Sequence, residues 1–82
     1  MTMKYVVVFE QTSNNWAAYV PDLPGCVATG DTREETEQLI REAVELHVES
    51  LVAHDEEVPA PGAWTGIVEV PEPLTLTNGT AR

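Results

Sequence analysis

Four carboxylates stand where acidic chemistry has to be considered, and they are Glu10, Asp22, Asp31 and Glu35. Metal-dependent cleavage of a phosphodiester requires several such groups to converge within about 4 Å of a metal pair. A turn and a helix start already explain Asp22 and Asp31, because short acidic side chains accept hydrogen bonds from nearby backbone. The sequence contains no nucleophile–base pattern, P-loop or dinucleotide fingerprint. We therefore expect no catalytic residue and no enzyme activity, with a metal-dependent nuclease as the alternative.

Zinc binding would have to use Cys26, His47 and His54. The two histidines are seven residues apart, so a helix can place both on one side. The closely spaced ligand pairs that are typical of zinc sites are absent. A small buried apolar side chain explains Cys26, because no second cysteine can resolve it and no base flanks it. The sequence therefore predicts no metal site, no bound cofactor and no reactive thiol.

Length and charge narrow the classes of function further. The chain has 82 residues with 4 basic and 14 acidic side chains, a net charge of −10, and this length fits one domain. Affinity for phosphate comes from Lys and Arg, so the charge argues against direct binding of nucleic acid or of anionic membranes. No apolar run approaches the roughly 18 residues of a membrane span, and no signal peptide is visible. Because a single cysteine cannot form an internal disulfide, we expect a cytoplasmic protein.

Three short strands are predicted in the first thirty residues. Residues 5–9 and 16–20 are rich in β-branched and aromatic side chains, and the polar residues between them favour a hairpin. Residues 26–29 predict the third strand, which Gly30 ends. These strands contain most of the apolar residues of the N-terminal half.

The loop Pro-Asp-Leu-Pro-Gly-Cys at 21–26 has a defined shape according to its composition. Pro21 and Pro24 fix their own backbone and remove two ladder donors. Pro24 and Gly25 suit the central positions of a type II turn, whose second position needs a positive φ. We expect Pro21, Asp22, Pro24 and Gly25 to be structural.

A long amphipathic helix is predicted after this loop. Thr32 and Glu35 have the spacing of a capping box, in which a hydroxyl and a carboxylate each accept from a free backbone N–H. Apolar residues then recur every three or four positions, which predicts one helix over 32–53, roughly 33 Å long. Gly30, Thr32 and Glu35 are therefore expected to shape the helix start.

Acidic residues dominate this helix and its end. Residues 33–57 hold nine acidic and two basic side chains, a net charge of −7. A solvated helix face with a pair between Glu37 and Arg41 explains this run on its own. The alternative is a surface that attracts a basic protein, since complementary charge raises association rate and specificity. That surface would consist of Glu37, Glu42, Glu45 and Glu49.

Residues 64–70 predict a fourth strand, which prolines at 71 and 73 end. The order of elements is therefore β-β-β-α-β. We predict an α+β fold, a single domain with a small, mainly antiparallel sheet and one long helix packed on one face. The domain is expected to cover residues 1–72, and residues 73–82 are expected to form a flexible tail.

The first strand is apolar on both faces. Tyr5, Val7 and Phe9 point one way, whereas Val6 and Val8 point the other. One helix covers only one face, so we expect a second copy or another protein on the other, in a dimer or tetramer. The expected interface residues are Val6, Val8, Trp16, Trp64 and Val68. A place in the core suits the two tryptophans equally well.

The stretch at 20–32, which reads Val-Pro-Asp-Leu-Pro-Gly-Cys-Val-Ala-Thr-Gly-Asp-Thr, resembles the HicB-like antitoxin family. Further matching segments are 5–8, 16–19, Glu34-Glu35 and 56–61, so the resemblance covers about residues 3–70. It implies a small β-β-β-α-β domain described as a partial ribonuclease H fold without that fold's catalytic carboxylates. It also implies a domain that forms dimers or tetramers and blocks the catalytic surface of a small, basic, RNA-cleaving toxin of the HicA type.

In toxin–antitoxin pairs of this family, a C-terminal helix-turn-helix or ribbon-helix-helix segment binds operator DNA. Twelve residues follow Val70 here, too few for either segment, so we expect no operator binding. The expected function is an antitoxin-like protein-binding module that neutralises a toxin by occlusion. The alternative is a stand-alone oligomeric scaffold that binds a small molecule or peptide and has no toxin partner.

Overall fold

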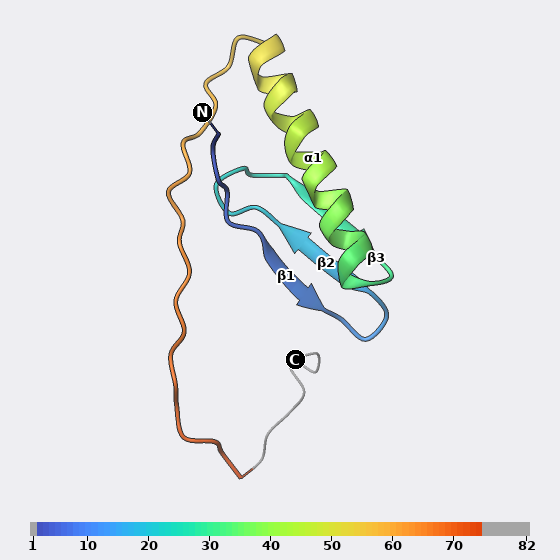
Figure 1. Ribbon diagram of the computed structural model, residues 1–82, viewed down its shortest axis with the longest axis vertical. Coiled ribbons are helices and arrows are strands. Elements are labelled where there is room, and N and C mark those ends of the chain that lie inside the picture. The colour runs from blue at the N-terminus through green and yellow to red at the C-terminus, as the bar shows by residue number, and fades with distance from the viewer. Residues whose placement is uncertain (1, 75–82) are drawn as a thin grey trace.

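The computed structural model describes residues 2–74 and shows a three-stranded sheet with one helix across it (Figure 1). The strands are β1 (Val8–Gln11), β2 (Trp16–Tyr19) and β3 (Val27–Gly30), and the helix α1 spans Arg33–Ala53. Neighbouring strands are antiparallel in the order β1-β2-β3, because short loops join them in sequence. The prediction of one small α+β domain with an antiparallel sheet and a long helix is confirmed.

The strand β1 begins three residues later than the sequence predicts. Its register pairs Val8 with Tyr19, so continuing the ladder would bring Val6 opposite Pro21. Pro21 has no N–H to donate and lies in the turn that follows β2, so the ladder ends before it. Residues 5–7 therefore lead into β1 without a ladder partner on β2.

Two consecutive turns join β2 to β3. The N–H of Leu23 donates to the carbonyl of Val20 at 3.0 Å, and the N–H of Cys26 donates to the carbonyl of Leu23 at 3.0 Å. Pro24 and Gly25 occupy the centre of the second turn, where Gly25 has the φ of 84° that a type II turn requires. The turns carry Leu23 and Cys26 into the core, where they are 0% and 4% exposed.

The core is small and lies where α1 crosses the sheet. Its buried apolar residues are Ala18, Val20, Leu23, Cys26 and Ile40. The buried hydroxyl of Thr36 donates to the carbonyl of Thr32 at 2.7 Å, so this polar group is satisfied. Gly30 allows the close approach of β3 and α1, because a Cβ there would lie 2.7 Å from Thr36 Oγ1.

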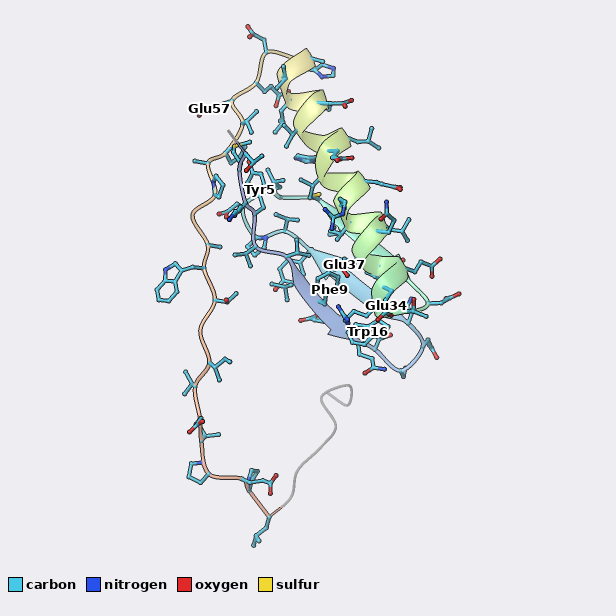
Figure 2. The ribbon with its side chains drawn as sticks, viewed as in Figure 1. Tyr5, Phe9, Trp16, Glu34, Glu37 and Glu57 are labelled. Carbon is cyan, nitrogen blue, oxygen red and sulfur yellow. The ribbon has the colours of Figure 1, made fainter. Side chains whose placement is uncertain are left out.

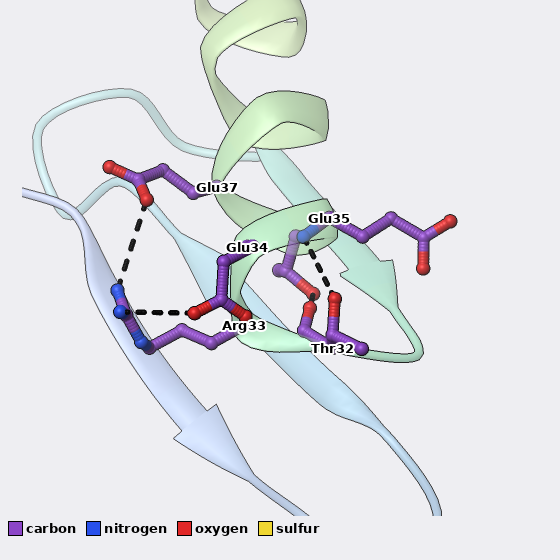
Figure 3. A network of polar contacts seen from close by, with 6 residues as sticks. Thr32, Arg33, Glu34, Glu35 and Glu37 are labelled. Atoms are coloured by element: carbon purple, nitrogen blue, oxygen red, sulfur yellow. Dashed lines mark hydrogen bonds and ion pairs between the residues drawn. The ribbon is translucent and has the colours of Figure 1, made fainter.

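Hydrogen bonds from side chains define the start of α1. The hydroxyl of Thr32 accepts from the N–H of Glu35 at 3.0 Å (Figure 3). The carboxylate of Glu35 accepts from the N–H of Asp31 at 2.8 Å, one residue before the partner of an ordinary capping box. The first bond satisfies a free N–H donor of the first helical turn, and the second satisfies the N–H of a residue just before the helix.

The end of α1 is a Schellman motif built on an aspartate. The N–H of Asp55 donates to Val52 at 3.1 Å, and the N–H of Glu56 donates to Leu51 at 2.8 Å. Asp55 has a φ of 58°, in the left-handed region that glycine usually occupies at this position. The geometry closes the helix after Ala53 at the expense of backbone strain in Asp55.

The fourth strand is not formed within the described residues, which corrects the predicted β-β-β-α-β order to β-β-β-α. Residues 64–70 run clear of the sheet as an extended chain (Figure 1). Trp64, Ile67 and Val68 are 86%, 94% and 85% exposed. Their residue types favour extended backbone, but a strand exists only where a neighbouring strand provides hydrogen bonds.

We call residues 58–63 the connector and residues 64–74 the arm. The arm elongates the molecule, whose Cα radius of gyration is 15.5 Å, against about 12 Å for a compact chain of this length. Residues 75–82 of the predicted tail lie outside the described residues. Within the described part, no helix combines the length and the apolar character that crossing a bilayer demands.

Candidate functional site

An open groove runs between the residues that lead into β1 and one side of α1. Its volume is about 380 Å³ beside β1, and it continues past Met3 into a more open space of about 570 Å³. The lining residues beside β1 are Met3, Tyr5, Val7, Phe9, Ile40 and Val44, together with Glu37, Arg41 and Glu45. The groove thus has an apolar floor and a charged border, which are common features of binding surfaces.

The groove exists because α1 covers only part of the sheet. The helix packs mainly on β3 and β2, so the side of β1 stays open. Strand alternation turns Val7 and Phe9 to the same side as buried Ala18, which is the partner of Phe9 across the ladder. The floor of the groove is therefore the uncovered part of the apolar layer that forms the core.

Acidic side chains border the groove along α1. Glu37 and Glu45 line it beside β1, and Glu45 and Glu49 line its extension. Glu42 does not line the groove, and its carboxylate accepts from Gln38 Nε2 at 3.0 Å. Three of the four residues predicted as an acidic partner surface thus line the groove, and Glu42, seven residues before Glu49 on the same side of α1, does not.

The ion pair of Glu37 differs from the predicted one. Arg33 Nη1 lies 3.8 Å from Glu37 Oε1, and Arg33 Nη2 lies 3.4 Å from Glu34 Oε2 (Figure 3). These side chains are at least half exposed, so such a pair one helical turn apart contributes only about 0.3–0.5 kcal/mol. Arg41, the predicted partner, lines the groove instead.

A second apolar surface is the sheet face that is turned away from α1. Val8, Tyr19 and Val27 lie side by side across the three strands. Tyr19 and Val27 are 41% and 63% exposed, and alternation places Val6 on the same face. Among residues 2–74 nothing covers this face, and its role in self-association stays a prediction.

Two distant segments hold the connector on the domain. The carboxylate of Asp22 accepts hydrogen bonds from the N–H groups of Gly62 and Ala63, both at 3.0 Å. The hydroxyl of Tyr5 donates to the carbonyl of Pro59. The bonds from Ala63 and then Gly62 lower the pKa of Asp22, because they stabilise the charged carboxylate. Asp22 and Tyr5 therefore fix the place where the arm leaves the domain.

The carboxylates considered for phosphodiester chemistry have separate roles. Glu10 is exposed on the sheet face opposite α1, Asp22 binds the connector, and Glu35 binds the N–H of Asp31. Across residues 2–74, no three side chains of His, Cys, Asp or Glu gather closely enough to hold a metal ion. The structure thus gives Asp22 and Glu35 structural contacts, whereas Glu10 and Asp31 are exposed.

The three residues considered for zinc binding lie in different surroundings. Cys26 is buried, and this burial raises the pKa of its thiol. The ring Nδ1 of His54 lies 2.7 Å from the carbonyl of Ser50 at the end of α1, and His47 is half-buried. The interpretation of Cys26 as a small buried side chain is confirmed.

The predicted interface residues do not form one surface. Val6 and Val8 lie on the open sheet face, whereas Trp64 and Val68 project from the arm. Trp16 is half-buried and lies by strand alternation on the face that α1 covers (Figure 2).

Sequence reasoning missed the groove itself. A signal was available, because a helix about 10 Å wide cannot cover four strands spaced about 4.7 Å apart.

A family model described as "HicB_like antitoxin of bacterial toxin-antitoxin system" matches residues 5–75. The chain belongs to the HicB-like antitoxin family. Among its relatives, Antitoxin HicB 2 of Photorhabdus laumondii is 34% identical over 84% of this chain and 50% of that protein. A 14.9 kDa protein of Haemophilus phage HP1 is 33% identical over 85% of this chain and 53% of its own length. A UPF0150 protein of Synechocystis is 45% identical over 67% of this chain and 71% of its own length.

The HicB-like match also bears on the arm. The chain spans about half the length of Antitoxin HicB 2 and of the phage protein. The family model nevertheless continues past the last helix and includes the whole connector and the arm. The family match therefore covers the arm, although the arm has no strand partner within residues 2–74.

Proposed function

We propose that this chain is a non-catalytic, antitoxin-like module that neutralises a small, basic, RNA-cleaving toxin by covering its surface. Membership in the HicB-like antitoxin family supports this function, as does similarity to a protein named Antitoxin HicB 2. The observation that carries the proposal is the acidic border that Glu37, Glu45 and Glu49 form beside an apolar groove. A basic partner supplies the complementary charge, and the groove accepts an apolar anchor from it.

The charge of the whole chain supports the same kind of partner. The net charge is −10, and residues 33–57 account for −7 of it. Opposite charges speed the encounter of two proteins and exclude partners of the wrong sign. Because Glu45 and Glu49 are exposed, dissolved salt screens their attraction. We expect the association rate with the toxin to fall as salt is added, while the dissociation rate changes little.

The first experiment pairs the purified chain with the small basic protein encoded next to its gene. Cleavage of a labelled RNA by that protein is measured while the chain is titrated in. We expect cleavage to stop at an equimolar ratio and the two proteins to elute as one complex. Full cleavage in the presence of excess chain, with no complex on the column, would contradict the proposal.

A second experiment tests the acidic border directly. The double variant Glu45→Lys with Glu49→Lys should lower the association rate about tenfold, since steering charges act mainly on that rate. The matched control is the double variant Glu10→Lys with Glu72→Lys, which changes the total charge by the same amount at exposed positions that do not line the groove. Equal effects of the two variants would show that only total charge matters and that α1 is not the contact surface.

The groove favours a second candidate function, a scaffold that binds a small molecule or peptide. Its volume of about 380 Å³ lies within the range of roughly 300–1,000 Å³ found for small-molecule sites. Binding of a ligand that shifts the NMR signals of Val7, Phe9 and Val44, without any effect of toxin, would support this candidate.

A further inference from the structure

The charged border of the groove contains one positive charge among three negative ones. Its side chains on α1 follow one another at intervals of four residues, and they are Glu37, Arg41, Glu45 and Glu49. Four residues of helix rise about 6 Å, so the border presents a negative, a positive and two negative charges over roughly 18 Å. Among the described residues that line the groove, Arg41 is the only basic one.

Arg41 makes no ion pair within residues 2–74, although glutamates lie one helical turn away on both sides. Arg33 holds Glu37 instead, with Nη1 at 3.8 Å from Oε1. Glu45 follows Arg41 along the helix, and an acidic residue that follows its basic partner gives the weaker orientation of such a pair. Arg41 is exposed, so its guanidinium remains available to a carboxylate of another molecule.

The open side of β1 has room for a second helix. Phe9 from β1 and Glu37 from α1 line the same groove (Figure 2), and α1 packs mainly on β3 and β2. The outer strands of a three-stranded sheet are about 9.5 Å apart, and packed helices have axes about 8–10 Å apart. A helix beside α1 would therefore lie over β1, with its apolar side chains on Phe9 and Val44. Its side chains would also recur every four residues, as the charges of the border do.

Neither the rest of this chain nor a second copy complements the border. Residues 54–74 contain five acidic and no basic side chains, together with four prolines, which interrupt helices. Laid against itself in either direction, the border of a second copy would bring glutamates opposite glutamates. Like charges that face each other across a contact reduce affinity. The border therefore favours a helix from a different, basic protein.

We propose that the groove binds an amphipathic helix of a basic partner, whose single carboxylate meets Arg41 and whose flanking basic side chains meet the glutamates of the border. The inference rests on the proposed function, because it specifies which part of the toxin enters the groove. It adds a requirement beyond net charge, since the helix has to carry an acidic residue between basic ones. A basic residue in that place would be repelled by Arg41, so Arg41 selects among basic helices.

Two helical peptides of about 18 residues test this requirement. Both carry leucines toward the groove and basic residues at intervals of four, and one has a glutamate at an inner charged position where the other has a lysine. The glutamate is placed second of four in one version and third in another, so that both helix directions are covered.

Calorimetry measures the affinity of each peptide. We expect the wild-type chain to bind one glutamate version about fivefold more tightly than the lysine peptide, although the glutamate peptide is less basic. Arg41→Glu should reverse this order. NMR signals of Val7, Phe9 and Val44 should shift on binding. Equal affinities, or a preference of the wild-type chain for the lysine peptide, would overturn the proposal.

The basic protein encoded next to the gene provides a second test. Arg41→Gln is compared with Lys4→Gln, which removes the same charge at an exposed position outside the groove. Both variants are more acidic, so both should associate slightly faster with that protein. Only Arg41→Gln should raise the dissociation rate, by about threefold to fivefold. Equal dissociation rates of the two variants would contradict a specific contact of Arg41.

The two proposals can fail separately. Inhibition of RNA cleavage without any selectivity between the peptides would overturn the helix site and leave the antitoxin function intact. Selectivity for the glutamate peptide without inhibition would support the helix site, and it would favour the peptide-binding scaffold over the antitoxin.

Discussion

Asp22 joins two parts of the chain that are forty residues apart. It lies in the turns between β2 and β3, and its carboxylate binds the backbone of Gly62 and Ala63. A carboxylate that accepts two N–H groups is more stable when charged, so the pKa of Asp22 lies below its ordinary value of 3.8. The contact therefore favours folding of the connector above pH 3.8 and loses its contribution as pH falls through the lower, folded-state pKa.

The pH dependence of the connector follows from this contact. The amide signals of Gly62 and Ala63 should titrate together, with a midpoint below pH 3.8, in a series of ¹H–¹⁵N spectra. Asp22→Asn keeps an oxygen acceptor but does not titrate, so its two amide signals should stay constant over the same range. A midpoint at or above 3.8 in the wild-type chain would show that the bonds do not stabilise the charged form.

Asp55 has a strained backbone, so a substitution there can increase stability. Its φ of 58° is unfavourable for a side chain with a Cβ, and its charge lies at the negative end of the α1 dipole. Asp55→Gly should raise the free energy of unfolding by about 0.5–1 kcal/mol. Glycine relieves the backbone strain of the folded state, and this gain is larger than the loss that comes from the greater conformational entropy of the unfolded chain. Chemical denaturation measures the change. Asp55→Asn removes only the charge, and a fall in stability for both variants would contradict the account.

At the scale of elements, the junction of β3 and α1 leaves no room for an added methyl group. Gly30→Ala would place a Cβ 2.7 Å from Thr36 Oγ1 and 3.1 Å from Thr36 N. Because Thr36 is fully buried, the helix has to shift, and we expect a loss of about 1–3 kcal/mol in unfolding free energy. Gly66→Ala is the matched control, since nothing lies within 4 Å of a Cβ there. Equal stability of the two variants would exclude tight packing at the junction.

The start of α1 depends on one hydroxyl. Thr32→Ala removes the acceptor for the N–H of Glu35 and should lower the free energy of unfolding by about 1 kcal/mol. Thermal unfolding followed by circular dichroism should show a fall of roughly 4–8 °C for a change of that size. Thr32→Ser keeps the acceptor and should restore most of the stability. The core bond of Thr36 uses the backbone carbonyl of Thr32, so neither substitution removes it.

Local features of the elements could be predicted from the sequence because neighbouring residues determine them. The Pro24-Gly25 turn and the Thr32–Glu35 spacing each involve residues at most three positions apart. The start of β1 could not be predicted, because the ladder register, and with it the ladder's end before Pro21, depends on another strand. The partner of Glu37 was likewise undetermined, since Arg33 and Arg41 lie one turn away on either side.

The fourth strand and the groove could not be predicted for the same reason, because both depend on residues that are far apart in the sequence. The residue types at 64–70 predict extended backbone, and the structure has it, but they carry no information on which edge will pair with it. The groove beside β1 arises from the place where α1 settles on the sheet, which depends on packing against β3 and β2. The local sequence pattern therefore predicts the backbone conformation of each segment well. Which elements lie next to each other depends on how the core packs, and the local pattern does not determine that.

At the scale of the whole molecule, one chain leaves much apolar surface in water. The five buried apolar residues in the described part of the chain make a small core, and a chain of this size buries only about 60% of its unfolded surface. The groove, the open sheet face and the arm each carry apolar side chains that no other part of residues 2–74 covers. Association would therefore contribute a large share of the stability.

The unfolding temperature should consequently depend on protein concentration. The predicted self-association would add stability by mass action, so a rise in concentration would shift the equilibrium toward the folded, associated state. We expect the midpoint of thermal unfolding to rise steadily between low and high micromolar concentrations of the wild-type chain. Val27→Glu puts a charge on the open sheet face, where the predicted interface residues Val6 and Val8 lie, and should unfold at one concentration-independent, lower temperature. A wild-type midpoint that stays constant over this range would mean that the single chain is stable alone, with its apolar edge and groove exposed.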